Sequence, residues 1–158
     1  SPHLQSQFLI LSRGVNIREV TMLFPVTRKC DDYGCGHFGA SRGSRKHHGV
    51  DFTSTPGQFV TSDVDGTVTK IGYPYADDLS YRYVQVTTKD GFDCRYFYTS
   101  ASLGVSDSVR VGQVIGNAQD ISARYTNGDM VNHVHFEVKK DGKFTNPVEF
   151  LKGLGLKI

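Results

Sequence analysis

The chain has 158 residues, of which 38% are hydrophobic and 22% charged, and its formal net charge is +2. This composition is typical of a soluble globular protein with a buried core, and it excludes a disordered chain. The nearly balanced charge argues against a nucleic-acid-binding face. No apolar run reaches the roughly 18 residues that a membrane-spanning helix needs.

The chain divides into a weakly patterned start and a β-rich remainder. Residues 1–23 hold two apolar runs, at 8–11 and 15–23, that could each form a strand. We expect this segment to be an N-terminal extension or a lead-in from a larger protein. Residues 24–158 are expected to form one domain.

Within the remainder, runs of β-branched and aromatic residues alternate with glycine-containing turn signals. These runs predict strands at 49–53, 59–61, 67–71, 81–88, 92–99 and 131–139, and a pair of short strands within 109–116. Residues 146–151, with Pro147 near the start, predict a short terminal helix. The fold class that follows is mainly β, an antiparallel sheet with few helices.

The three cysteines bear on whether the protein works in an oxidising or a reducing compartment. Cys30 and Cys35 bracket a polar, turn-like stretch that could bring the thiols together. A Cys30–Cys35 disulfide would imply an oxidising environment, whereas two free thiols would fit a cytosolic protein. A zinc knuckle is disfavoured because no second ligand pair follows. Cys94 lies in an aromatic run and is interpreted as a buried, small apolar residue.

Two short motifs carry metal-ligand chemistry. His47 and Asp51 are four positions apart, and His133 and His135 form a His-x-His pair about 80 residues later. In a strand the two histidines point to the same face, roughly 7 Å apart. A catalytic zinc ion uses three imidazole or carboxylate ligands and keeps a water in the fourth position. Together the motifs predict one zinc ion and a hydrolase, although each motif alone is common by chance.

The residues around the two motifs have secondary roles in this interpretation. Gly49 would let the backbone approach the metal closely. Glu137 shares a face with the histidines and could orient an imidazole, although a glutamate at such a place is more often an ordinary surface residue of the strand. His48 points away from His47 in an extended segment and is not expected to be a ligand.

Taken together, these motifs resemble the lysostaphin-type zinc endopeptidases, which cut peptide cross-links of bacterial peptidoglycan. The similarity runs from about residue 24 to residue 151. It is carried by segments 38–42, 47–52, 62–68, 111–116 and 133–138. The resemblance implies that His47, Asp51 and His135 are the zinc ligands and that His133 is the catalytic histidine beside the metal-bound water. It also implies long loops around a substrate groove, at 73–81 and 121–130.

A narrower resemblance connects the cysteine segment and residues 45–51 with the leukocyte cell-derived chemotaxin 2 subgroup, which comprises secreted vertebrate signalling proteins. It supports the Cys30–Cys35 disulfide. Where the peptidases carry Tyr-x-His-Leu, with a second catalytic histidine, this chain has Tyr96-Phe97-Tyr98-Thr99. Tyr98 therefore replaces that histidine. A tyrosine cannot act as a base near neutral pH, but it can donate a hydrogen bond to a developing oxyanion.

Two functions follow from these resemblances. The first is a zinc endopeptidase that hydrolyses cross-links or stem peptides of peptidoglycan, as a domain of a phage or of a secreted effector. It would act as a monomer outside the cell or in the periplasm, with an inhibitor or immunity protein as a further partner. The alternative is a catalytically impaired, extracellular zinc-binding module that recognises a receptor or a glycan.

Overall fold

The computed structural model describes residues 6–12, 16–22, 41–42, 45–46, 48–126 and 128–155, with side chains from residue 48 onward. His47, Cys30 and Cys35 lie outside the described residues, and the predictions made for them stay predictions. The boundary between residues 1–23 and 24–158 also stays a prediction. Strands β1 (Ser6–Ser12) and β2 (Asn16–Met22) confirm the two strands expected there and pair with each other as an antiparallel hairpin.

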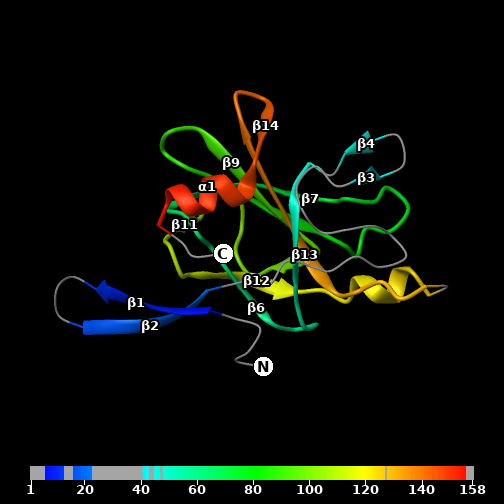
Figure 1. Cartoon of the computed structure of the whole chain (residues 1–158), viewed down its shortest axis with the longest axis horizontal. Helices are drawn as coiled ribbons and strands as arrows, with labels where there is room; N and C mark the ends of the chain where they lie inside the picture. The colour runs from blue at the N-terminus through cyan, green and yellow to red at the C-terminus, as the bar shows by residue number, and fades with distance from the viewer. Residues whose placement is uncertain are drawn as a thin grey trace.

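The main sheet follows the strand order β11-β7-β8-β9-β13-β14, and β5 also pairs with β13. Figure 1 labels strands β7, β9, β11, β13 and β14 of this sheet. All of its pairings are antiparallel, which confirms the predicted fold class. Its strands are β5 (Val50–Thr53), β7 (Gly66–Gly72), β8 (Tyr83–Thr87), β9 (Phe92–Phe97), β11 (Ser108–Val109), β13 (His133–Lys140) and β14 (Lys143–Thr145).

A second, smaller sheet has the order β10-β12-β6. It comprises β6 (Phe59–Thr61), β10 (Thr99–Ala101) and β12 (Val114–Ala118). Two very short strands, β3 (Ser41–Arg42) and β4 (Arg45–Lys46), pair on their own. The helical elements of the described residues are a 3-10 turn, η2 (Ile121–Arg124), and the short helix α1 (Pro147–Gly153). The side chain of Asn146 caps the start of α1 and accepts hydrogen bonds from the first turn.

The core lies on one face of the main sheet because the strands alternate. On β13, Val134, Phe136 and Val138 are almost completely buried, and the ring of Phe136 packs 4.9 Å from that of Tyr96. The same alternation directs His133, His135 and Glu137 to the opposite face. Cys94 is a free, fully buried thiol in this core, as the sequence predicts.

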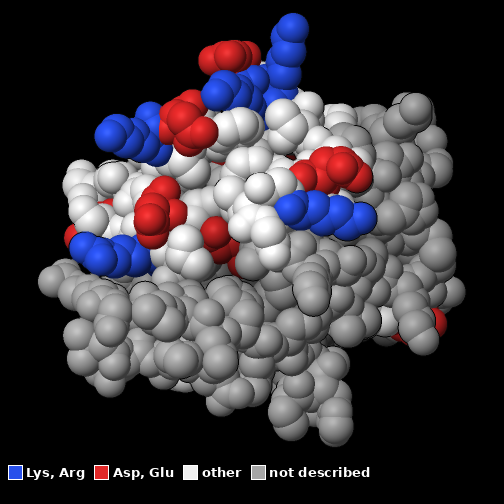
Figure 2. All heavy atoms as spheres, turned by 60° about the vertical axis from the view of Figure 1, so that its left-hand side comes forward, with Lys and Arg blue, Asp and Glu red and all other residues white. Residues whose placement is uncertain are grey.

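The described surface carries charges of both signs. On the face shown in Figure 2, Lys and Arg side chains alternate with Asp and Glu side chains over the described part of the chain. No helix within that part is long and apolar enough to cross a membrane.

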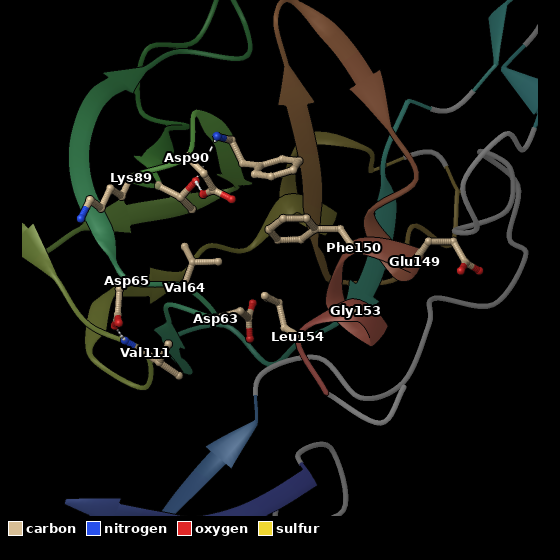
Figure 3. A pocket seen from close by; sticks show the side chains of 12 residues that line it. Asp63, Val64, Asp65, Lys89, Asp90, Val111, Glu149, Phe150, Gly153 and Leu154 are labelled. Carbon is tan, nitrogen blue, oxygen red and sulfur yellow. Dashed lines mark hydrogen bonds between the residues drawn. The ribbon is translucent and has the colours of Figure 1, made fainter. Parts of the chain in front are cut away.

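A hollow of about 580 Å³ lies between α1 and the turns that precede β7 and β9. Figure 3 shows Phe150 projecting over it and Glu149 pointing away. At its wall, Asp63 Oδ2 accepts a hydrogen bond of 3.0 Å from the buried hydroxyl of Tyr96. Burial raises the pKa of Asp63 to about 7, although this hydrogen bond acts in the opposite direction. Because Tyr96 belongs to the core face, the hollow and the three polar residues of β13 lie on opposite faces of the sheet.

Asp63→Asn should remove a pH dependence of stability. The folded protein keeps the Asp63 proton up to about pH 7, whereas the unfolded chain releases it near pH 3.8. The free energy of unfolding of the parent should therefore fall as pH rises between these two values and level off above them. The variant should lose this slope, and above pH 7 its free energy of unfolding should exceed that of the parent by about 1–2 kcal/mol. The difference is kept small because the side chain of Asp63 is partly exposed to solvent. Urea unfolding at several pH values measures both quantities, and identical pH profiles for the two proteins would contradict the assignment.

Candidate metal centre

The register of two strand pairs brings the predicted residues together. Asp51 on β5 lies directly opposite His135 on β13, and His133 lies opposite Thr53. Asp51 Oδ1 is 2.8 Å from His135 Nδ1, and Asp51 Oδ2 is 3.6 Å from His133 Nε2. Only 2% of the surface of Asp51 is exposed. A buried carboxylate is thus held between two imidazoles, on the face of the sheet that the sequence predicts.

His135 has a carboxylate at each ring nitrogen. Its Nδ1 donates to Asp51 at 2.8 Å, and its Nε2 donates to Glu137 Oε1 at 2.9 Å. Burial acts to lower the pKa of His135, but the hydrogen bonds to Asp51 and Glu137 raise it to about 9. The His135 ring therefore carries a positive charge at neutral pH in the metal-free protein. The position of Glu137 is the one expected of a residue that orients an imidazole.

The pKa of Glu137 is shifted by its contact with His135. Burial acts to raise its pKa, but the hydrogen bond and charge of His135 lower it overall. Arg95 on the neighbouring strand lies in register with Glu137 and adds positive charge to the same row. Glu137 is therefore an acceptor for His135 and not a proton donor.

The His133 ring is oriented by the backbone. Its Nδ1 lies 2.7 Å from the carbonyl oxygen of Val131, and because a carbonyl can only accept, Nδ1 carries the proton of this hydrogen bond. In the neutral ring Nε2 is then the unprotonated nitrogen, and it lies 3.6 Å from Asp51 Oδ2. His133 is 4% exposed, so the ring has little room to turn. In this tautomer Nε2 is the ring atom that can accept a proton.

Tyr98 lies beside His133 on a break between two strands. The sequence predicts one strand over 92–99, but β9 ends at Phe97 and β10 begins at Thr99, with Tyr98 at φ 63°. The carbonyl of Arg82 accepts from the N–H groups of both Tyr98 and Thr99. This shared acceptor holds Tyr98 in a left-handed conformation that is unfavourable for a bulky residue.

The break aims the Tyr98 ring at the site. The ring stands edge-on to His133, with centroids 5.3 Å apart and planes at 88°. Burial raises the pKa of Tyr98 to about 12. Its hydroxyl therefore stays protonated at neutral pH, where it can donate a hydrogen bond but cannot act as a base.

Gly49 provides the space that the His135 ring occupies. A Cβ at this position would lie 2.3 Å from the carbonyl oxygen of Phe136 and 2.8 Å from both Cε1 and Nε2 of His135. Any side chain here would displace the ring or the strand. His48 is exposed, and its ring stacks on that of Phe144 with centroids 4.1 Å apart.

The donor atoms of the cluster fit a zinc ion. Carboxylate oxygen and imidazole nitrogen are zinc ligands, and two such atoms on a tetrahedral ion lie roughly 3.3 Å apart. Asp51 Oδ1 and His135 Nδ1 already face each other at 2.8 Å, so a small separation would admit the metal. Among the described side chains, no three His, Cys, Asp or Glu residues form a complete metal site. A third protein ligand would come from His47, which lies outside the described residues.

Sequence reasoning missed a group that borders the site. Tyr75 and Tyr125 come from the two loops expected to line the groove, and their hydroxyl oxygens are 2.9 Å apart. Arg124 lies 3.6 Å from the ring centroid of Tyr75 and forms an ion pair of 3.0 Å with Asp77. Nothing periodic in the sequence marks these residues, since their contacts join positions about 50 apart.

Gly49→Ala should weaken metal binding by moving His135. We expect zinc affinity to fall at least tenfold, and the metal-free protein to lose about 1–3 kcal/mol of stability through overpacking. Competition with a chromophoric chelator measures the affinity, and urea unfolding measures the stability. Gly153→Ala is the matched control, because a Cβ there would meet nothing within 4 Å. Unchanged zinc affinity in Gly49→Ala would contradict the placement of the His135 ring.

Comparison with known proteins identifies relatives over much of the chain. The chain is 25% identical to leukocyte cell-derived chemotaxin-2 from Bos taurus over 137 residues, which cover 87% of this chain and 84% of that protein. It is 33% identical to stage II sporulation protein Q from Bacillus subtilis over 106 residues, which cover 65% of this chain but only 35% of that protein.

A solved structure and a family model agree with this result. The catalytic domain of the antimicrobial peptidase lysostaphin from Staphylococcus simulans superposes with a TM-score of 0.58 at 25% identity, covering 77% of this chain and 91% of that chain. The fold is therefore lysostaphin-like. The model of peptidase family M23 matches residues 45–147, well over half of the chain. The match includes the described residues Asp51, Tyr98, His133 and His135, and the chain belongs to peptidase family M23.

Proposed function

We propose that the protein is a zinc-dependent endopeptidase that hydrolyses cross-links or stem peptides of bacterial peptidoglycan. M23 is a family of peptidoglycan hydrolases, and the fold of this chain is that of the lysostaphin catalytic domain. One observation carries the proposal. Asp51 lies between His135 and His133, with its Oδ1 2.8 Å from His135 Nδ1 and its Oδ2 3.6 Å from His133 Nε2.

Three residues would hold the metal in this proposal. Asp51 and His135 supply two ligands, and His47 supplies the third. Zinc held by these residues would supply Lewis-acid chemistry, which would polarise the scissile carbonyl and lower the pKa of a water molecule toward neutrality. Glu137 fixes the His135 ring through Nε2, so that Nδ1 stays directed at Asp51.

Two further residues would transfer the proton and stabilise the negative charge that develops on the substrate. His133 Nε2 accepts the proton of the attacking water and then passes it to the leaving amine. Its Nδ1–H remains bonded to the Val131 carbonyl throughout, which keeps the ring in place. Tyr98 donates a hydrogen bond to the substrate carbonyl oxygen as negative charge develops there.

The setting of the reaction follows from the substrate. Peptidoglycan lies outside the cytoplasmic membrane, so the protein would act outside the cell or in the periplasm, as a monomer. A Cys30–Cys35 disulfide would be compatible with that compartment. An inhibitor or immunity protein that covers the groove would be a natural further partner of such an effector.

Peptidoglycan digestion tests the proposed activity. We expect zinc-loaded protein to release muropeptides with new peptide ends, measured by mass spectrometry. His133→Ala should lower the rate by at least a hundredfold, because it removes the proton acceptor. His48→Ala, which removes a surface histidine stacked on Phe144, is the control and should leave the rate within twofold. If the zinc-loaded parent releases no new peptide ends, the proposal is wrong.

A second candidate is a zinc-binding module without catalytic activity that recognises a receptor or a glycan. It is favoured by the similarity to leukocyte cell-derived chemotaxin-2, of which the chain covers 84%, and by Tyr98 in place of a catalytic histidine.

Tyr98→His discriminates between the two candidates in the same digestion assay. If the protein is an endopeptidase, the parent is already active and the substitution changes its rate less than tenfold, since both side chains donate a hydrogen bond. A parent without activity and an active Tyr98→His variant would support the second candidate instead.

A further inference from the structure

Three tyrosine hydroxyls form a chain that ends at the candidate metal centre. The hydroxyl of Tyr75 donates to that of Tyr98 over 3.3 Å, and the hydroxyl oxygens of Tyr75 and Tyr125 are 2.9 Å apart. Tyr75 belongs to the loop between β7 and β8, and Tyr125 follows η2. Tyr98 is the member that reaches His133.

The number of protons on each hydroxyl sets the donor-to-acceptor direction of these tyrosine hydrogen bonds. A phenol has one proton to donate, and the proton of Tyr75 is directed to Tyr98. Tyr75 therefore cannot donate to Tyr125, so Tyr125 donates to Tyr75. The Tyr98 hydroxyl accepts from Tyr75, and among the hydrogen bonds of the described residues it donates to none. Its own proton is left for a group in the site.

Tyr75, the middle tyrosine of the three, is held in place by other side chains. The guanidinium of Arg124 stacks on the ring of Tyr75 at 3.6 Å, and its NH2 group bonds both carboxylate oxygens of Asp77. Tyr81 packs edge-on against both Tyr75 and Tyr98, with centroids 5.8 and 6.4 Å away. These contacts fix the position of Tyr75 from two loops, independently of its hydroxyl.

We propose that Tyr75 is a positioning residue, and that the directed chain Tyr125–Tyr75–Tyr98 presents Tyr98 to the substrate as a hydrogen-bond donor. The inference rests on the proposed endopeptidase function and deepens it. Without the hydrogen bond from Tyr75, the Tyr98 hydroxyl would be free to rotate and to turn its proton back toward Tyr75. The hydrogen bond from Tyr75 would thus fix the direction in which the Tyr98 hydroxyl donates its proton, just as a hydrogen bond to one ring nitrogen fixes the tautomer of a histidine.

Tyr75→Phe tests the chain, because it deletes one hydroxyl and keeps the ring that Arg124 contacts. On solubilised peptidoglycan peptides we expect kcat to fall roughly tenfold with little change in KM, the size expected for loss of one oriented hydrogen bond. In a Tyr98→Phe background the same substitution should change kcat less than twofold, since the two hydroxyls act as one unit. Tyr81→Phe is the matched control, because its hydroxyl belongs to the same aromatic cluster but donates to the carbonyl of Asp120.

A second measurement does not depend on activity. Tyrosine labelled with ¹³C at the ring carbon that bears the hydroxyl gives one NMR signal per tyrosine, and Tyr98→Phe identifies the Tyr98 signal. At neutral pH this signal should shift in Tyr75→Phe and stay in place in Tyr81→Phe. An unmoved Tyr98 signal, or equal kcat values for Tyr75→Phe and Tyr81→Phe, would overturn the inference. A shifted signal in a protein that cleaves nothing would support the chain and overturn the proposed function.

Discussion

The pairing register of β13 is the constraint on which the whole site depends. Asp51 on one neighbouring strand and Phe97 on the other both lie opposite His135. Because side chains alternate along a strand, a slip of one residue would turn His133 and His135 into the core and expose Phe136. The burial of Val134, Phe136 and Val138 excludes that slip, so the core on one face fixes the polar cluster on the other.

The cluster also has an electrostatic constraint. Asp51 is almost fully buried, and a buried carboxylate without a positive partner is strongly destabilising. In the metal-free protein the proton on His135 supplies that partner, which is why the pKa of His135 is raised. A divalent cation bound between the same two atoms would replace the proton. The metal-free and the metal-bound arrangements would then differ by a small movement and not by a change of fold.

The sequence predicted those parts of the molecule that depend on local patterns. Strand alternation was enough to place His133, His135 and Glu137 on one face, and turn signals located most of the strands. That Asp51 lies opposite His135 depends on the pairing of β5 with β13, which alternation alone does not give. The break at Tyr98 was missed, because a non-glycine residue at positive φ leaves no signal in the sequence. The strand β14 and the turn η2 were also not anticipated. The contacts of Tyr75 with Tyr98 and Tyr125 join separate loops, which no local pattern can reveal.

The central claim concerns the residues that would hold the metal. Diffraction from zinc-loaded crystals, recorded at the zinc absorption edge, tests that claim most directly. We expect one zinc peak bonded to His47, to Asp51 and to Nδ1 of His135, with His133 close by but not bonded. A zinc ion bonded to His133, or no peak between Asp51 and His135, would contradict the account.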